Sequence, residues 1–232
     1  MNKSRRMAAL QARALAARGY AVLLVDLHGC GDSDGDFADA RWHHWKGDLA
    51  AASAWLTARV ERPVGLWGLR LGALLALDYA HTAAQPVAQL VLWQPVTDGA
   101  QFLTQFLRLR VAGAMLDQGA PGATTSALRA ELAQGQTLEV GGYMLAPEMA
   151  ASIDALNAAQ LSPSCPTDWL EIVAAPERPL PPGAGRVAAS WQRPAVSVQT
   201  VACAQFWSTQ EIVECPALIA ATIAALEVRH DR

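Results

Sequence analysis

Residues 64–80, VGLWGLRLGALLALDYA, decide the fold class. A short apolar run at 64–67 predicts a buried strand, and the residues from 73 onward have the composition of a helix. Between them stands GLRLG, in which two glycines flank Arg70 at a distance of two residues. Glycines at these positions let the central residue take a strained backbone conformation while its flanks approach the strand and the helix. We therefore expect a sharp strand-to-helix turn with Arg70 at its apex.

The same alternation of strand and helix continues on both sides of this stretch. Strands joined through helices by short connections form right-handed βαβ units on a parallel sheet, so the pattern predicts an α/β fold. The predicted strands are 21–26, 64–67, 87–93, 169–174 and 195–201, and the predicted helices are 4–18, 45–60, 73–80 and 216–226.

The segment 97–162 interrupts this alternation. Its runs QFLRLRVAGAML and PEMAASIDALNAAQL have apolar residues at helical spacing, and it contains no clear strand. We expect an inserted, mainly helical lobe at 97–162, between a first part of the core at 1–96 and a second part at 163–232.

Composition excludes several classes of protein. The chain has 232 residues, of which 52% are hydrophobic and 17% charged, so it is too apolar to be disordered. Its net charge of −3 gives no attraction to a phosphate backbone, and we expect no nucleic-acid partner. The apolar tail at 216–226 is about half of the ~20 residues that a membrane span needs. Arg13 and Arg18 interrupt the apolar run near the N-terminus, which argues against a signal peptide.

The cysteines show no paired spacing. Their positions contain no CxxC motif, so we expect neither a zinc site nor a disulfide framework, and we place the protein in the reducing cytoplasm. We expect no metal and no cofactor. The four cysteines are Cys30, Cys165, Cys203 and Cys215.

The turn at Arg70 has the pattern of the nucleophile elbow of α/β-hydrolases. That elbow ordinarily presents a serine, whereas an arginine stays protonated and cannot act as the nucleophile. Upstream, Asp26 and the following HGCGDSDG resemble the D-x-x-G-x-G-x-S loop of the same superfamily, in the expected order. Together the two motifs predict an α/β-hydrolase-like fold, a mostly parallel sheet with helices on both faces. We assign the elbow to Gly68, Leu69, Arg70, Leu71 and Gly72.

The chain also resembles a specific family, the exosortase A system-associated hydrolases of type 2, which accompany bacterial exosortase and PEP-CTERM sorting systems. The resemblance implies that arginine at the elbow is a family feature, and that the protein is an esterase-like hydrolase working with protein sorting or exopolysaccharide. A complete α/β-hydrolase carries further strands before the first helix, so we expect N-terminal strands to be missing. The matching segments are 1–16, 25–42, 66–80, 90–110, 141–148 and 206–222.

A catalytic triad also needs a histidine in the loop after the last strand and an acid. That loop begins CAQFW at 203–207 and contains no histidine, although Glu171 or Glu177 could supply the acid. The catalytic residues therefore stay unassigned, and two functions stay open. One is an esterase-like hydrolase; the other is a non-catalytic protein that holds an anionic ligand or a protein partner with Arg70. The five histidines are His28, His43, His44, His81 and His230.

The side chains around Arg70 carry further alternatives. Arg70 either binds an anionic or acyl ligand or pairs with an acid such as Asp26 or Asp98 in a structural role. His28 is a candidate base or a brace of its loop, and Ser33 and Cys30 are weak candidates for a substitute nucleophile. Gln94 and Trp207 fall at the ends of strands, where binding pockets open in such sheets. The candidate pocket is formed by His28, Ser33, Gln94 and Trp207.

Overall fold

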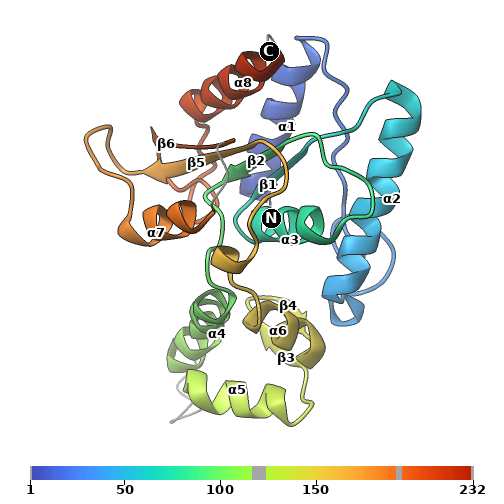
Figure 1. Ribbon diagram of the computed structural model, residues 1–232. Helices are drawn as coiled ribbons and strands as arrows, with labels where there is room; N and C mark the ends of the chain where they lie inside the picture. The colour runs from blue at the N-terminus through green and yellow to red at the C-terminus, as the bar shows by residue number, and fades with distance from the viewer. Residues whose placement is uncertain (1, 117–123, 192–194, 231–232) are drawn as a thin grey trace. The chain divides into compact units, whose positions relative to one another are not determined.

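The computed structural model describes residues 2–116, 124–191 and 195–230 (Figure 1). Contacts between residues divide the chain into two compact units. The sheet unit comprises Met1–Val25, Ala52–Thr97 and Ala158–Arg232, and the lobe unit comprises Asp26–Ala51 and Asp98–Asn157. The division of the chain into 1–96, 97–162 and 163–232 stays a prediction, and residues 117–123 and 192–194 lie outside the described residues.

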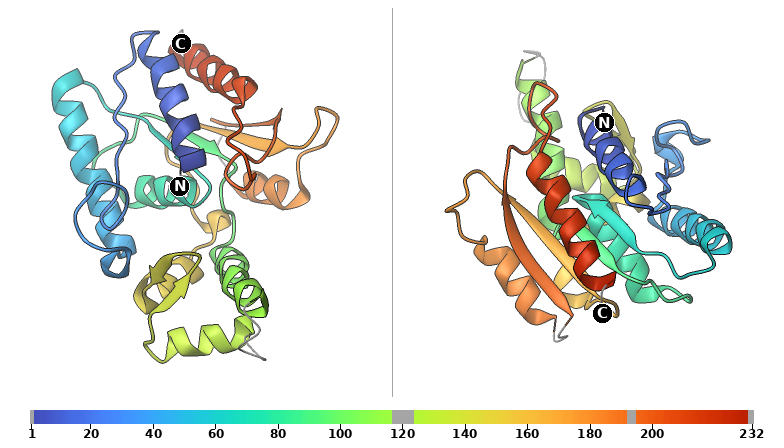
Figure 2. Two further views of the ribbon diagram at one scale, coloured as in Figure 1. Left: turned by 180° about the vertical axis from the view of Figure 1, so that it is seen from behind. Right: turned by 90° about the horizontal axis from the view of Figure 1, so that it is seen from above.

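The sheet unit contains a four-stranded parallel sheet in the order β1-β2-β5-β6. Parallel strands need crossover connections, and the chain supplies helices for them. Helices α1 and α8 cover one face of the sheet, and α3 and α7 cover the other (Figure 2). The predicted α/β architecture is therefore confirmed. The strands are β1 Leu66–Leu69, β2 Leu90–Trp93, β5 Thr167–Val173 and β6 Val196–Ala202; the helices are α1 Asn2–Ala16, α3 Leu71–Thr82, α7 Pro182–Ser190 and α8 Pro216–His230, with a 3₁₀ turn, η2, at Ala158–Gln160.

The core of the sheet unit lies between the sheet and helices α1 and α8. Strands β2 and β5 are buried along their whole length, as expected for inner strands of a parallel sheet covered on both faces. Trp93 is buried among them, and its Nε1 donates to Thr222 Oγ1 at 2.8 Å, so its polar atom has a partner. The cluster comprises Met7, Val91, Trp93, Leu170, Ile172, Val201, Phe206, Cys215 and Leu218.

The predicted strand at 21–26 was wrong. Residues 21–27 pair with no strand among the described residues, and Leu23, Leu24 and Val25 are 38%, 50% and 37% exposed. An apolar run forms a strand only where a neighbouring strand offers backbone donors and acceptors in register. Strand β1 is the edge of the described sheet, so no described strand lies beyond it to pair with residues 21–26. The hydrophobicity of this run is therefore not sufficient to make it a strand.

The lobe unit is helical but also contains a hairpin, which corrects the expectation of no strand in 97–162. Its strands β3, Leu138–Val140, and β4, Tyr143–Leu145, are antiparallel. Gly141 and Gly142 connect them with φ of 57° and 85°, the left-handed values that a two-residue hairpin turn requires. Three-residue strands are too short to show alternation in the sequence. The other elements are α4 Gly99–Leu116, α5 Thr125–Ala133, α6 Pro147–Asp154, the 3₁₀ turn η1 Phe37–Asp39 and the first part of α2, Trp42–Val60, whose later residues belong to the sheet unit.

A disulfide joins Cys203 and Cys215, although the cysteine spacing gave no indication of a disulfide framework. The two residues are separated by 12 positions with no characteristic spacing, and the fold brings their Cα atoms to 6.0 Å. The cysteine pattern therefore gives no argument for a reducing compartment. Cys30 and Cys165 lie outside this disulfide.

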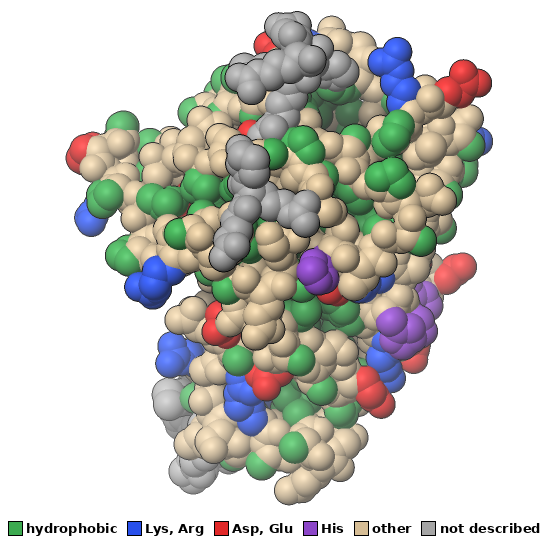
Figure 3. All heavy atoms as spheres, in the orientation of Figure 1, with side chains coloured by type: hydrophobic (Ala, Val, Ile, Leu, Met, Phe, Trp, Pro, Cys, Tyr) green, Lys and Arg blue, Asp and Glu red, His purple; other side chains and the backbone are tan. Residues whose placement is uncertain are grey.

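The surface carries charges of both signs. On the face shown in Figure 3, acidic and basic side chains are interspersed, in keeping with the small net charge. Among the described helices, none is both long enough and apolar enough to cross a membrane.

Candidate functional site

Arg70 lies between β1 and α3 in a strained backbone conformation, with φ 55° and ψ −118°. Gly68 makes this turn possible, because a Cβ on Gly68 would collide with the backbone carbonyl of Gly72 and with Ala73 Cα. Gly72 differs, since a Cβ there would meet no atom within 4 Å. The turn therefore has the geometry of a nucleophile elbow with arginine at its apex, and only the first glycine is required by close approach.

Backbone hydrogen bonds hold Arg70 against the end of β2. Its N–H donates to Trp93 O at 2.9 Å, and its carbonyl accepts from Val96 N at 3.2 Å. The carbonyl also accepts from Ala73 N at 3.1 Å, which starts α3. Strained residues persist where their surroundings fix them, and these bonds supply that constraint.

The Arg70 side chain faces a carbonyl group and an indole ring. Within the described chain its guanidinium donates one hydrogen bond, from Nη1 to Gln94 O at 3.5 Å. Its Cζ lies 5.5 Å from the centroid of the Trp207 ring, within cation–π range. Burial lowers the pKa of Arg70, and the negative charge of Glu171 opposes that shift. A guanidinium remains protonated under such perturbations, so the apex carries a half-buried cation with unused donors.

Glu171 is the acid whose charge acts on Arg70. It is 5% exposed, and its carboxylate accepts from Gln94 Nε2 at 2.9 Å and Trp169 Nε1 at 2.7 Å. Burial raises the pKa of Glu171, while the bonds from Trp169 and Gln94 and the charge of Arg70 oppose the rise. The acids named from the sequence, Asp26 and Asp98, lie in the lobe unit and accept backbone N–H groups there.

Gln94 links Arg70 and Glu171 to the sheet. It follows β2 with φ 43°, and its Oε1 accepts from Ile172 N at 2.6 Å. The same amide donates to Glu171, so both ends of the Gln94 side chain are bound to β5. Gln94 thereby holds its own carbonyl toward the Arg70 guanidinium.

The other predicted site residues belong to the lobe unit. His28 is fixed through its backbone, because its N–H donates to Asp48 Oδ2 at 2.8 Å and its carbonyl accepts from Trp45 Nε1 at 3.0 Å. Ser33 Oγ donates to Asp26 O at 2.5 Å. These bonds brace the loop that follows Asp26.

Cys30, in the same loop, is not an activated thiol. Burial raises the pKa of Cys30, and the charges of Asp26 and Asp48 add to the rise. The thiol therefore stays protonated and poorly nucleophilic at neutral pH. A common pocket of His28, Ser33, Gln94 and Trp207 stays a prediction; the structure brings Gln94 and Trp207 to Arg70.

The triad partners show the same departure from a hydrolase. The loop after β6, residues 203–215, reads CAQFWSTQEIVEC and has no histidine. Glu177 follows β5 and is exposed, and the side chain of His230 lies outside the described ones. Trp169 was missed from the sequence, although its spacing of two from Glu171 places both on one face of a strand.

Comparisons with known proteins place this chain in a family. The family model of the serine aminopeptidases S33 matches residues 1–150. The chain belongs to this α/β-hydrolase family. Within the curated proteins, no significant match was found.

Solved structures of α/β-hydrolases agree in fold. Est1E of Butyrivibrio proteoclasticus, solved with ferulic acid bound, has a TM-score of 0.63 at 15% identity, covering 97% of this chain and 82% of its own. The metagenome-derived lipolytic enzymes LipS and LipT give 0.60 at 18%, covering 94% and 86%. The monoacylglycerol lipase of Paleococcus ferrophilus gives 0.59 at 15%, covering 92% and 86%. At such identities the likeness establishes the fold alone.

Proposed function

We propose that this protein is a non-catalytic member of its hydrolase family that binds a small oxyanion, a carboxylate or a phosphate group, at Arg70. One observation carries the proposal: the backbone conformation that presents a nucleophile in this fold here presents a guanidinium. A guanidinium cannot attack an ester, but it binds carboxylate and phosphate through charge-assisted hydrogen bonds.

The surroundings of Arg70 support a binding role. Its single described hydrogen bond is long, so donors of the guanidinium remain for a ligand. The N–H groups of Leu71 and Gly72 open α3 beside it, and the start of a helix favours negative charge. Glu171 offsets part of the charge, but its carboxylate is engaged by Trp169 and Gln94.

An esterase-like activity is the alternative that family membership favours. It needs a serine at the elbow and a general base, whereas this chain has Arg70 and no histidine in the loop at 203–215. The nucleophile and base of an acyl-transfer mechanism are therefore missing from these two positions.

We also propose that the protein acts with an exosortase, PEP-CTERM or exopolysaccharide system, on the strength of the six resembling segments. Cells that lack this protein should then mis-sort a PEP-CTERM reporter or release less exopolysaccharide. Normal sorting and normal polysaccharide output would contradict the association.

Isothermal titration with sulfate and with benzoate tests the oxyanion site. A charge-assisted hydrogen-bonded contact contributes about 1.5 to 3 kcal/mol, so Arg70→Ala should weaken binding roughly ten- to a hundred-fold. Arg70→Lys should recover part of the loss because it keeps the charge without the planar fork. Arg186→Ala, an exposed arginine of α7, is the matched control and should bind as wild type does. Equal affinities for wild type and Arg70→Ala would reduce Arg70 to a structural residue.

A further inference from the structure

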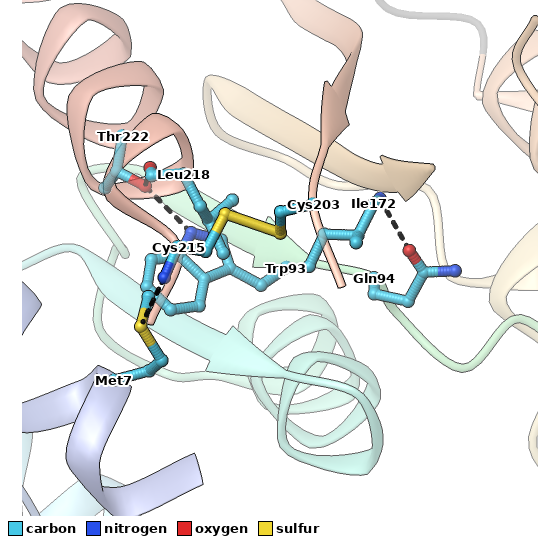
Figure 4. The surroundings of a disulfide bond; sticks show 8 residues. All are labelled: Met7, Trp93, Gln94, Ile172, Cys203, Cys215, Leu218 and Thr222. Atoms are coloured by element: carbon cyan, nitrogen blue, oxygen red, sulfur yellow. Dashed lines mark hydrogen bonds between the residues drawn. A yellow bond between two sulfur atoms is a disulfide. The ribbon is translucent and has the colours of Figure 1, made fainter. Parts of the chain in front are cut away.

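Backbone hydrogen bonds fix both ends of the loop at 203–215. Cys203 N donates to Val173 O at 3.0 Å, which extends the pairing of β6 with β5 by one residue. Cys215 O accepts from Leu218 N and Ile219 N, the first bonds of α8. The disulfide between the two cysteines therefore ties the end of a strand to the start of a helix (Figure 4).

The disulfide is buried on one side only. Cys215 is 1% exposed, belongs to the core cluster beside Trp93, and its N–H points to Met7 Sδ at 3.2 Å (Figure 4). Cys203 packs against the same cluster but is partly exposed. Cys203 is thus the more exposed cysteine of the pair, and an attacking thiolate is expected at its sulfur rather than at that of Cys215.

The loop connects this crosslink to the Arg70 site through two neighbouring aromatic residues. Phe206 is 0% exposed and lies 6.3 Å from the Trp93 ring, so it anchors the loop in the core. Trp207 lies 5.1 Å from Phe206 and 5.5 Å from the Arg70 guanidinium, and it is partly exposed. The anchor and the aromatic contact to Arg70 are both inside the loop that the disulfide closes.

We propose that the Cys203–Cys215 disulfide is a redox-controlled clamp that holds Trp207 against Arg70 and keeps the anion site ordered. The second half of this proposal rests on the proposed function. Reduction of the disulfide restores conformational freedom to residues 204–214. Trp207 then contacts the Arg70 guanidinium for less of the time, and the anion site loses its preorganisation.

The switch requires a dithiol reductant. One thiolate of the reductant attacks Cys203 Sγ, forms a mixed disulfide and expels the Cys215 thiolate, which takes up a proton. The second thiol of the reductant then displaces Cys203 as thiolate, which is protonated in turn. Two electrons pass to the protein, and the reductant leaves as its own disulfide.

Chemical modification of Arg70 by phenylglyoxal, followed by peptide mass mapping, tests the clamp without any ligand. The background Cys30→Ser/Cys165→Ser leaves a single cysteine pair. A cation–π contact at a partly exposed site is worth a factor of about two to five, so reduction with dithiothreitol should speed Arg70 modification by that factor. Arg186, mapped in the same sample, should react at one rate in both states.

Two variants separate the clamp from a general loosening of the fold. Trp207→Ala, with the disulfide intact, should react at the faster rate and gain nothing from the reductant. Cys203→Ser/Cys215→Ser should react at the faster rate with or without it. An Arg70 rate that does not change on reduction would overturn the proposal. A disulfide that stays closed in the folded protein, shown by intact mass, would overturn it as well.

Sulfate titration of the oxidised and reduced protein distinguishes the two proposals. The clamp predicts that affinity falls about two- to five-fold on reduction. If Arg70 reactivity responds and sulfate binds in neither state, the clamp stands and the oxyanion function falls. If sulfate binds equally in both states and the reactivity is unchanged, the clamp alone falls.

Discussion

The elbow at 68–72 and the loop at 203–215 depart from a hydrolase in opposite ways. At the elbow the backbone keeps the strained turn of the family and only the side chain at its apex is altered. In the loop after β6 the expected histidine is absent, and a disulfide and the pair Phe206–Trp207 occupy the segment instead. The comparison shows that the geometry of a catalytic turn and its reactive group are separable, because backbone contacts of the turn do not involve the side chain at its apex.

Substitution of Gly68 should give the largest effect of all. A methyl group there would meet the backbone of Gly72 and Ala73, which cannot move without breaking α3, so Gly68→Ala should destabilise the fold by at least ~4 kcal/mol. Gly72→Ala is the matched control, since that position is open and alanine is favoured in a helix; its change should stay within about 1 kcal/mol. Urea unfolding measures both, and similar losses for the two variants would contradict the account of the turn.

Loss of the crosslink should be the next largest effect. Closing a loop of this length restricts the unfolded chain by about 3 kcal/mol, so Cys203→Ser/Cys215→Ser should lower the midpoint of thermal unfolding by roughly 6 to 12 °C. The control Cys30→Ser/Cys165→Ser changes only the cysteines outside the disulfide and should unfold close to wild type. Equal midpoints for the crosslink variant and wild type would mean that the core alone fixes the loop.

The protonation of Glu171 should make the stability of the fold depend on pH. Because burial raises the pKa of Glu171 in the folded state, the folded protein binds more protons than the unfolded chain above the ordinary pKa of a glutamate. This group therefore contributes stability at low pH that is lost as pH rises through its folded pKa. Glu171→Gln removes this loss of stability at high pH. The free energy of unfolding of the variant, measured by chemical unfolding and compared with that of wild type, should therefore increase with pH. A difference that decreases with pH would contradict a raised pKa for Glu171.

The same variant should bind anions more tightly at neutral pH. Without the negative charge of Glu171, Arg70 should hold sulfate about two- to five-fold better, the scale of a partly exposed ion pair. The affinity of wild type for sulfate should rise toward that of the variant as pH falls through the pKa of Glu171. The affinity of the variant should not change over the same range. Sulfate is a suitable probe because it remains a dianion over this range.

The sequence predicted the parts of this protein that depend on local pattern. The strands β2 and β5 and the helix α3 were expected close to where they lie, because apolar runs and helical spacing are read from neighbouring residues. The turn at Arg70 was expected for the same reason. A strained strand-to-helix turn needs only one nearby glycine, here Gly68, and the end of the adjacent strand.

The features that the sequence did not predict depend on distant partners. The run at 21–26 is apolar up to Asp26, yet it forms no strand, because no strand lies in register beside it among the described residues. Cys203 and Cys215 meet only after β6 and α8 are in place. Glu171 was considered as a triad acid, whereas its position across the sheet makes it the charge partner of Arg70.

The most direct test of the central claim is intact mass spectrometry after exposure to a fluorophosphonate probe, applied to wild type and to Arg70→Ser. The account predicts that neither protein gains the mass of the probe. Wild type has no serine at the apex, and the variant has a serine without a histidine in the loop at 203–215 to activate it. Stoichiometric labelling of wild type would reveal a nucleophile elsewhere in the chain, and labelling of Arg70→Ser would show that a general base does serve the elbow. Either result would contradict the claim that this member of the family is non-catalytic.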